Sequence, residues 1–453
     1  MTRSDELSRL DLDHLFHPST DLRGHGQSGP LIWDRGEGVY IFDTEGRKYL
    51  EGMAGLWCTA LGYGEKELAR VAAEQTEKFC YGPLFAGKSN EPSIRLAAKL
   101  SEWVPIENAR FLFGCSGSDA NDTQVKLMRY YYNAIGKPHK KKILSRFNGY
   151  HGVTLASAAL TGLPAFHRHF DLPGDDVIHL TAPHHYRQAE PGESEEAFSQ
   201  RLADELETVI EREGAETIAA FIAEPLMAAG GVIPPPAGYF EKIQPILAAN
   251  DILFIDDEVV CGFGRTGHDF GCQTWQIRPH TMTMAKALSS AYQPISAVAV
   301  PPFMYEAIEE AAGGVGMFAH GLTYAGHPVA AAVALRNLEL MEERGVMEHA
   351  ARMGDYLERA LAPLADHELV GNLRGRGLIA GLELVADKAS GQPFAAERKM
   401  AFKAAASCLD EGLVVRALPG DTIAICPPLI ITEQQIDELV EKLSRGLDRL
   451  RHS

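Results

Sequence analysis

Short apolar runs without polar alternation recur along this chain, and each has the length of a strand buried on both faces. They cover residues 111–113, 142–144, 218–222, 252–255, 281–285 and 296–300. Runs of this kind are typical of parallel sheets that helices cover on both sides. The pattern therefore predicts an α/β fold with a mainly parallel central sheet.

Stretches with a helical period separate these runs. They cover residues 91–104, 122–135, 200–213, 305–312, 327–343 and 433–450. In residues 91–104 the period places Ile94, Leu100 and Trp103 on the inward face. Near the N-terminus residues 38–43 and 48–50 read as a hairpin, and strands are expected near 378–384, 414–416 and 423–425. Both ends of the chain thus predict smaller lobes beside the large sheet.

Two of the buried strands end in charged residues. Residues 252–255 are followed by Asp256, Asp257 and Glu258, and the run at 281–285 is followed by Lys286 among small, apolar neighbours. Ligands in open α/β sheets bind outside the carboxyl ends of the strands. An acid and an amine are therefore expected at one crevice.

Charge and composition narrow the class of partner. The chain has 453 residues, 45% of them hydrophobic, and a formal net charge of −18. The acidic balance argues against nucleic acid and against an anionic membrane surface, and no stretch has the length and apolarity of a membrane span. Seven scattered cysteines without a CxxC pair suit reduced thiols in a cytoplasmic protein. A small-molecule partner is expected.

Histidine spacing does not predict a metal centre. His167, His169, His184 and His185 lie in a loop-rich region, but no pair shares a helix face beside a carboxylate. Solvated or structural histidines are the simpler interpretation, and no metal site is expected.

A glycine- and serine-rich turn leads from the strand at 111–113 into a long helix. It reads GCSGSDAN over residues 114–121. Backbone N–H groups and hydroxyls at a helix start bind phosphate well. Simple N-capping by Ser116 or Ser118 explains the same residues equally well, so this turn by itself leaves both readings open.

A GxGxxG motif at residues 262–267 resembles a dinucleotide fingerprint but lacks its context. The sequence that follows is interrupted by Gly271 and has no apolar helical period. No acid stands about 20 residues further on, and the preceding strand end is already anionic. The motif is therefore not interpreted as a nucleotide loop.

Pyridoxal 5'-phosphate accounts for the unusual features together. An amine in apolar surroundings can form a Schiff base, a carboxylate can keep the pyridine nitrogen protonated, and a helix start can hold the phosphate. A carboxylate about 4 Å from a pyridinium stabilises it by about 4 kcal/mol at an effective dielectric of about 20. A plain salt bridge between Asp257 and Lys286 would leave the phosphate cup and the clustered acids unexplained.

These residues also resemble the signature of the class III pyridoxal phosphate-dependent aminotransferases. The resemblance rests on IDDEVVCGFGRTG at 255–267 with a lysine 29 residues after Asp257, on GMAGLW at 52–57, on Gly117-Ser118, on YHG at 150–152, and on Glu224-Pro225, Thr323-Tyr324 and Pro427-Pro428. It covers nearly the whole chain. It implies a fold type I transferase that works as a homodimer with shared active sites, and dimers pairing into tetramers are left open. The implied domains are residues 1–60 and 327–453 for the small α+β domain and 61–326 for the large cofactor-binding domain.

The resemblance also implies roles for individual residues. Lys286 corresponds to the Schiff-base lysine and proton shuttle, and Asp257 to the partner of the pyridine nitrogen. The remaining implied cofactor contacts are the phosphate cup Gly117 and Ser118, the ring-stacking Tyr150, Val259 on the opposite ring face, Glu224 near the cofactor, and Thr323 as a phosphate ligand from the other subunit. Asp256 departs from the small residue commoner at its position, and we expect it to stabilise the acid cluster or to face away.

Within the family the chain is most similar to the pyruvate-dependent ω-transaminases. Trp57, Phe85, Tyr150 and Ala228 match positions that line the amine pocket there, although from pattern alone Trp57 is a core residue or a pocket residue. Arg416 resembles the mobile arginine that binds the acceptor's carboxylate, and a surface arginine is its simpler alternative.

The resulting hypothesis is a two-stage transfer of an amino group from a primary amine or ω-amino acid to a keto acid, pyruvate. A decarboxylase or aminomutase on the same scaffold is the alternative enzyme. A binding protein that has lost catalysis is the alternative of another class, and the presence of both Lys286 and Asp257 argues against it.

Overall fold

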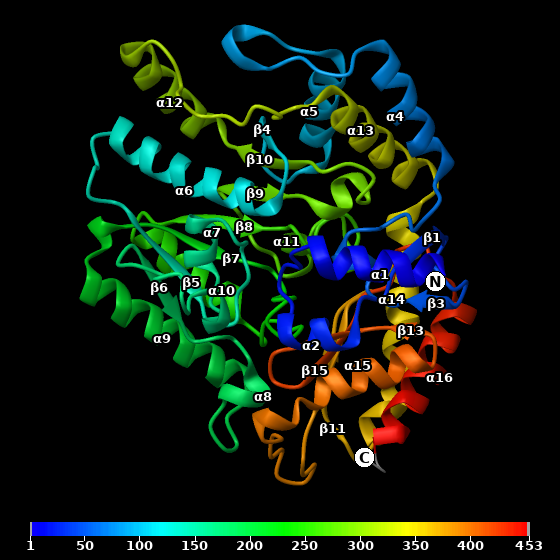
Figure 1. Ribbon diagram of the computed structural model, residues 1–453. Coiled ribbons are helices and arrows are strands. Elements are labelled where there is room, and N and C mark those ends of the chain that lie inside the picture. Colours follow the sequence, from blue (N-terminus) through cyan, green and yellow to red (C-terminus); the bar gives the residue numbers. More distant parts are fainter. Residues whose placement is uncertain (1, 451–453) are drawn as a thin grey trace.

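A seven-stranded sheet forms the centre of the computed structural model, which describes residues 2–450 (Figure 1). Six strands run parallel, and β10 is antiparallel to both of its neighbours. In sheet order the strands are β4 (Arg110–Gly114), β10 (Ser296–Val300), β9 (Thr281–Met284), β8 (Leu253–Asp257), β7 (Ile218–Ala223), β5 (Lys142–Arg146) and β6 (Val177–Leu180). The predicted mainly parallel α/β sheet is confirmed.

Helices cover both faces of this sheet, which explains why its inner strands lack alternation. Every residue of β7, β8, β9 and β10 is buried. One face carries α6 (Gly117–Ala134), α7 (Leu155–Leu160) and α12 (Pro302–Val315). The other carries α4 (Lys66–Lys78), α5 (Glu91–Trp103), α9 (Glu195–Glu213), α10 (Tyr239–Ala249) and α13 (Pro328–Glu343).

Side chains of β8 alternate between these two faces. Leu253 and Ile255 belong to the apolar cluster beneath α6, whereas Phe254 belongs to the cluster on the α10 side. Because the period of a strand is two residues, Asp257 points to the α6 face and Asp256 to the opposite one.

Segments from both ends of the chain build two smaller sheets. In the first, β1 (Trp33–Glu37), β2 (Tyr40–Asp43) and β3 (Lys48–Glu51) form an antiparallel meander, and β13 (Leu413–Val414) adds in parallel to β3. The second has the order β11 (Val370–Gly375), β12 (Ala380–Leu384), β15 (Thr422–Ile425) and β14 (Arg416–Leu418). The two termini therefore contribute to one α+β region, as expected.

The remaining helices are short connections or cover the smaller sheets. The α-helices are α1 (Arg3–His14), α2 (Leu22–Ser28), α3 (Ala54–Trp57), α8 (His185–Gln188), α11 (Gly271–Thr274), α14 (Val346–Leu361), α15 (Met400–Asp410) and α16 (Glu433–Leu450). Single 3-10 turns are η1 (Phe85–Gly87), η2 (Pro164–Phe166), η3 (Ala215–Thr217), η4 (Lys286–Ser289), η5 (Ala362–Asp366) and η6 (Ala396–Arg398). Among the described residues, no helix combines the length and the apolarity that crossing a membrane requires.

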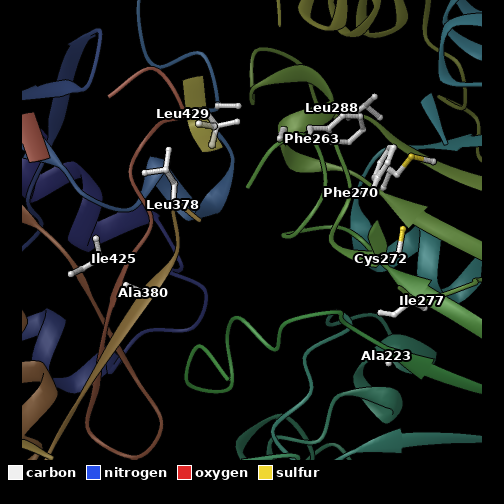
Figure 2. Packing of buried hydrophobic residues seen from close by; sticks show 14 of the residues in the cluster. Ala223, Phe263, Phe270, Cys272, Ile277, Leu288, Leu378, Ala380, Ile425 and Leu429 are labelled. Atoms are coloured by element: carbon white, nitrogen blue, oxygen red, sulfur yellow. The ribbon is translucent and has the colours of Figure 1, made fainter. Parts of the chain in front are cut away.

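Apolar packing joins the central sheet to the C-terminal sheet. One cluster of buried hydrophobic side chains includes Phe263, Phe270 and Leu288 beside the large sheet and Leu378 and Ile425 from the smaller one. Figure 2 shows these two groups on their separate elements. The loop at 262–267 is part of the connection, because Arg265 Nη1 donates to the carbonyls of Leu378 at 2.9 Å and Pro427 at 2.6 Å.

Three expectations about local structure are wrong. Ile94 is 58% exposed although its helix α5 forms, so the helical period identified the element and misplaced one member of its inward face. The helix expected from residue 122 starts at Gly117, because Ser116 caps it and accepts from the Asp119 N–H. The strand expected at 414–416 is split between two sheets, with Val414 in β13 and Arg416 in β14.

Candidate active site

Lys286 lies directly beyond β9, at the start of η4, in a strained backbone conformation. Its φ is +47°, a left-handed value that costs a non-glycine residue free energy and that surrounding contacts have to hold. Asn337 of α13 supplies those contacts. Its buried amide Nδ2 donates to the carbonyls of Ala287 at 2.9 Å and Leu288 at 3.1 Å, and its Oδ1 accepts from Ser290 Oγ at 2.6 Å. The hydrogen bonds from α13 thus hold the turn that carries Lys286.

Asp257 ends β8 and is held by polar groups from three other positions. Its Oδ2 is 2.8 Å from Asn121 Nδ2 and 2.8 Å from His151 Nδ1, and its Oδ1 accepts from the Val259 N–H at 3.2 Å. Asn121 also donates to the His151 carbonyl at 2.7 Å. These contacts fix the orientation of the carboxylate.

Glu224 follows β7 and braces two segments of the site from a fully buried position. Its Oε1 accepts from the Tyr150 N–H and its Oε2 from the Ala228 N–H, both at 3.0 Å. Burial raises the pKa of Glu224, and the nearby Asp257 charge raises it further, although the two backbone donors favour the ionised form. The residue fixes the backbone of Tyr150 and Ala228.

The three consecutive acids of the sequence separate into two environments. Asp256 and Glu258 lie on the face opposite Asp257, where their carboxyl oxygens and the Cys272 Sγ are all within 4.8 Å of one another. Glu258 accepts from the N–H groups of Gly271 at 2.9 Å and Cys272 at 2.6 Å. Neither carboxyl oxygen of Asp256 has such a donor in the described chain. Burial and the Glu258 charge raise the pKa of Asp256 well above its usual range, and burial raises the pKa of Glu258 to about 7.

The Trp57 ring lies close to both the Lys286 amine and the Arg416 guanidinium. Its ring centroid is 5.2 Å from Lys286 Nζ and 5.1 Å from Arg416 Cζ, and only 5% of the residue is exposed. Ala228 belongs to the same small cluster of buried hydrophobic side chains. Trp57 was expected to be either a core residue or a pocket residue. Its side chain is buried and its ring also lies near the Lys286 amine, so both descriptions apply.

Arg416 is a largely buried cation without an anionic neighbour. Within residues 2–450 its side chain makes no salt bridge and no hydrogen bond, and its contact is the Trp57 ring. Burial lowers the pKa of Arg416, while Tyr150 lies near enough to oppose that effect. A guanidinium in this setting is suited to bind a carboxylate.

The start of α6 lies beside Val259. A Cβ built on Gly117 would come within 3.1 Å of both Val259 methyl groups, so only glycine allows this approach without displacing Val259. In the described chain the N–H groups of Gly117 and Ser118 donate to no protein acceptor, as expected for the first turn of a helix. Ser118 Oγ accepts from the Val153 N–H at 3.1 Å, which ties the turn to the segment after Tyr150. N-capping by Ser116 and free N–H groups at the start of α6 therefore coexist here.

Phe85 and Thr323 lie together on a different, exposed patch. A Cβ on Gly321 would meet the Phe85 ring at 2.8 Å, and the Thr323 carbonyl accepts from Tyr81 Oη at 2.7 Å. Phe85 is 48% exposed, and no hydrogen bond or ring contact within residues 2–450 connects it or Thr323 to Lys286, Asp257 or Trp57. The connections that carry them, between α4 and α5 and between α12 and α13, run along the top of Figure 1.

Of the residues that sequence reasoning selected, the fold assembles most around Lys286 and Asp257. It also adds residues that were not assigned a role. Asn121 and His151 stand inside the quoted motifs at 114–121 and 150–152, which was the available signal, whereas Asn337 lies in a small-residue helix with nothing to mark it. An amine, a carboxylate and free helix-start N–H groups are the chemical groups that pyridoxal 5'-phosphate requires, so the residues fit that cofactor.

Comparison with known proteins agrees with this fit. The family model for aminotransferase class-III matches residues 23–447. The gamma aminobutyrate transaminase 3, chloroplastic, of Solanum lycopersicum is 47% identical over 430 residues, which cover 95% of this chain and 81% of that protein. The diaminobutyrate–2-oxoglutarate transaminase of Halomonas elongata is 43% identical over 456 residues, covering 99% of this chain and 97% of that one.

Solved structures of omega transaminases share the fold. The omega transaminase from Pseudomonas jessenii in complex with PMP has a TM-score of 0.97 and 50% identity, with 98% of each chain covered. A thermostable omega transaminase variant has a TM-score of 0.97 and 49% identity, covering 98% of this chain and 99% of that one. That variant has a tryptophan, a phenylalanine and an arginine replaced and was engineered for asymmetric synthesis of enantiopure bulky amines.

Proposed function

Since the chain belongs to the class III aminotransferases, we propose that it transfers an amino group from a primary amine or an ω-amino acid to pyruvate. The chain is an aminotransferase, and its solved neighbours are omega transaminases. The proposal concerns the two substrates, the residues that handle them and the assembly of the site.

Class III aminotransferases use pyridoxal 5'-phosphate, which when bound withdraws the electrons of the Cα–H bond of the donor. Lys286 Nζ would bind the cofactor's carbonyl and would move a proton to and from the donor's Cα. Asp257 would keep a proton at the pyridine nitrogen, and Asn121 and His151 fix the orientation of its carboxylate. The N–H groups of Gly117 and Ser118 would hold the phosphate.

Two residues are proposed to contact the two faces of the cofactor ring, and Glu224 holds one of these residues in place. Tyr150 and Val259 are the residues for the two faces, as the family resemblance implies. Glu224 supports this arrangement because it binds the backbone of Tyr150 and of Ala228 at the same time. Its role is therefore positioning: it links the ring-stacking residue to the wall of the amine pocket.

The observation that supports a keto acid as the acceptor is the unpaired, largely buried guanidinium of Arg416 beside Trp57. A carboxylate bound there would replace the water that a buried cation lacks, and a forked guanidinium can bind it through two hydrogen bonds. The same side chain, lying over an aromatic ring, can withdraw when an apolar amine enters.

Pyruvate fits this pocket better than a dicarboxylate. The other buried arginines near the site have protein acceptors: Arg146 donates to the Glu224 carbonyl at 2.7 Å, Arg265 donates to two carbonyls, and Arg374 pairs with Glu383 at 2.6 Å. Of these four arginines within residues 2–450, Arg416 alone has no hydrogen-bond acceptor, which matches the one carboxylate of pyruvate. The name of the Halomonas elongata relative specifies 2-oxoglutarate, which makes that acceptor the competing candidate.

Trp57, Phe85, Tyr150 and Ala228 are proposed to line the amine pocket. The tryptophan, phenylalanine and arginine replaced in the engineered omega transaminase are the residue types of Trp57, Phe85 and Arg416 here. Phe85 shares its exposed patch with Thr323. We therefore assign both residues to the site of the other subunit of a homodimer.

A substrate panel with the purified holoenzyme tests the function. An apolar amine such as 1-phenylethylamine and an ω-amino acid such as β-alanine are each combined with pyruvate or 2-oxoglutarate, and alanine and glutamate are quantified by chromatography. Faster formation of alanine is expected. Faster formation of glutamate would reject pyruvate as the acceptor and leave the aminotransferase assignment intact.

Arg416→Ala tests the observation that carries the proposal. Loss of a charge-assisted pair of hydrogen bonds, about 1.5–3 kcal/mol, is expected to raise the KM for pyruvate about 10- to 100-fold. The KM for 1-phenylethylamine should change by less than about threefold, because that donor has no carboxylate. The matched control is Arg398→Ala, an exposed arginine whose guanidinium lies 4.9 Å from the Phe394 ring. Equal effects on both substrates would reject the role of Arg416.

A further inference from the structure

The N-terminal arm, residues 3–28, is attached weakly to the rest of the chain. It comprises α1 and α2, and neither helix contains a buried residue. Figure 1 shows both helices lying across the front of the molecule. The arm's polar ties include an exposed salt bridge from Arg3 to Asp34 at 3.0 Å and a hydrogen bond from Ser4 Oγ to Thr44 at 2.9 Å. Contacts of this kind contribute little to stability.

Within this arm three side chains converge on one point. His17 Nε2 is 3.0 Å from Asp11 Oδ1 and 2.9 Å from Oδ2, and His25 Nε2 is 3.0 Å from the same Oδ1. The two imidazole rings are 4.2 Å apart between centroids and inclined by 50°. Asp11 comes from α1, His17 from the connection and His25 from α2, so the cluster links all parts of the arm.

The side chains of Asp11, His17 and His25 are only partly exposed to solvent. The exposed fractions of their side chains are 14% for Asp11, 26% for His17 and 15% for His25. They therefore form a partly sheltered site that solvent still reaches, which an ion needs for entry and for a water ligand.

We propose that Asp11, His17 and His25 bind a divalent transition-metal ion, Zn²⁺ or a chemically similar ion, and thereby clamp α1 to α2. The ligand atoms are the two Nε2 atoms and one carboxylate oxygen, which all lie within 4.8 Å of one another. Ligands about 2.0–2.1 Å from a tetrahedral Zn²⁺ are separated by about 3.3 Å, so the observed 3.0 Å between nitrogen and oxygen needs an outward shift of only a few tenths of an ångström. Water completes the coordination.

The donor atoms select the class of ion. Two imidazole nitrogens with one carboxylate suit Zn²⁺, Co²⁺, Ni²⁺ and Cu²⁺, whereas Mg²⁺ and Ca²⁺ prefer oxygen ligands throughout. A hydrogen-bonded cluster without metal would explain each nitrogen–oxygen distance separately. One carboxylate can also accept from both imidazoles at once, so the metal titration and the variants below decide between the two arrangements.

The other group of metal-binding residue types in the described chain, Asp256, Glu258 and Cys272, differs in each of these respects. It is fully buried, Glu258 is already bound by two backbone N–H groups, and burial raises the pKa of the Cys272 thiol, which opposes formation of the thiolate that a metal requires. The metal proposal is therefore confined to the N-terminal arm.

Titration of the untagged holoenzyme tests the proposal. The enzyme is treated with EDTA, exchanged into metal-free buffer and titrated with Co²⁺ while the visible d–d absorbance is recorded, and then with Zn²⁺ by calorimetry. One ion per chain is expected, with Zn²⁺ displacing Co²⁺. Absence of saturable binding would overturn the proposal.

Variants locate the site and provide its control. His17→Ala and His25→Ala are each expected to weaken Co²⁺ binding more than about tenfold, and Asp11→Asn to weaken it while keeping an oxygen in place. His14→Ala, an exposed histidine at the end of α1, should bind as the wild type does. The variants should fold, because no arm helix contributes a buried residue, and circular dichroism checks this. Undiminished binding in both His17→Ala and His25→Ala would overturn the proposal.

The clamp has its own readout, which is independent of catalysis. Zn²⁺ should slow limited proteolysis within residues 3–28 of the wild type and of His14→Ala, and should leave the cleavage of His25→Ala unchanged. Equal protection of His25→Ala would overturn the clamping role.

Discussion

Asp256→Asn is expected to flatten the pH dependence of stability without much effect on catalysis. Burial and the neighbouring Glu258 raise the pKa of Asp256, so the folded protein keeps a proton that the unfolded chain releases above about pH 4. A folded state that binds the extra proton loses stability as pH rises, over the window from the unfolded pKa to the raised folded pKa. Asparagine carries no such proton, and its amide can donate to Glu258.

The size of the effect follows from linkage. One proton costs the wild type about 1.4 kcal/mol of stability for each pH unit within that window. The unfolding entropy of a chain of 453 residues is about 0.95 kcal/mol/K, from about 2.1 cal/mol/K per residue. The apparent Tm of the wild type should therefore fall about 1.5 °C further per pH unit than that of Asp256→Asn.

Differential scanning fluorimetry of the holoenzymes at one-unit steps from pH 5 upward measures this difference. The exposed Asp175→Asn serves as the control, and its curve should run parallel to that of the wild type. Turnover of Asp256→Asn at its optimum should stay within about threefold of the wild type, because the side chain lies on the face opposite Asp257. Parallel Tm curves for the wild type and Asp256→Asn would refute the raised pKa of Asp256 in the folded protein.

Two substitutions test the presentation of the reactive amine. Lys286→Ala should abolish turnover and the visible absorbance of the covalently held cofactor, and measurable turnover in this variant would contradict the assignment. Asn337→Ala leaves the carbonyls of Ala287 and Leu288 and the Ser290 hydroxyl without their buried partner, which should cost about 2–4 kcal/mol and lower the apparent Tm by about 2–4 °C. Its cofactor should also dissociate more readily in dialysis, and an unchanged Tm together with unchanged cofactor retention would show that the turn does not depend on Asn337.

The amine and the carboxylate of the site were predictable because they are charged residues at the ends of otherwise apolar, buried strands. Lys286 and Asp257 interrupt buried apolar strands at their carboxyl ends, and the topology of parallel sheets brings such ends together. The resemblance to class III aminotransferases, carried by motifs along nearly the whole chain, is confirmed by the family model. Its assignments for individual residues stay predictions that the substitutions above test.

The partners of those groups were not predictable. Asn121 and His151 are brought to Asp257 by the packing of α6 and of the segment after β5, from positions 136 and 106 residues away. Asn337 reaches the turn at Lys286 from α13, and no periodicity marks it as functional. Likewise, the arm histidines His17 and His25 show no motif spacing, and only the arrangement of α1 and α2 places them on one carboxylate.

By itself the sequence determined the layers of the fold, the location of the crevice and the kinds of groups within it, since runs of apolar residues and charged strand ends are local properties. Tertiary structure decided which acid faces the site. The residue pattern alone does not distinguish the three consecutive carboxylates, and only the family resemblance singled out Asp257. The register of β8 between β7 and β9 turns Asp257 toward α6 and places Asp256 and Glu258 on the other side. The physical reason is the two-residue period of a strand, which places neighbouring side chains on opposite faces of the sheet. Which face each side chain meets is set only when helices pack on the two faces.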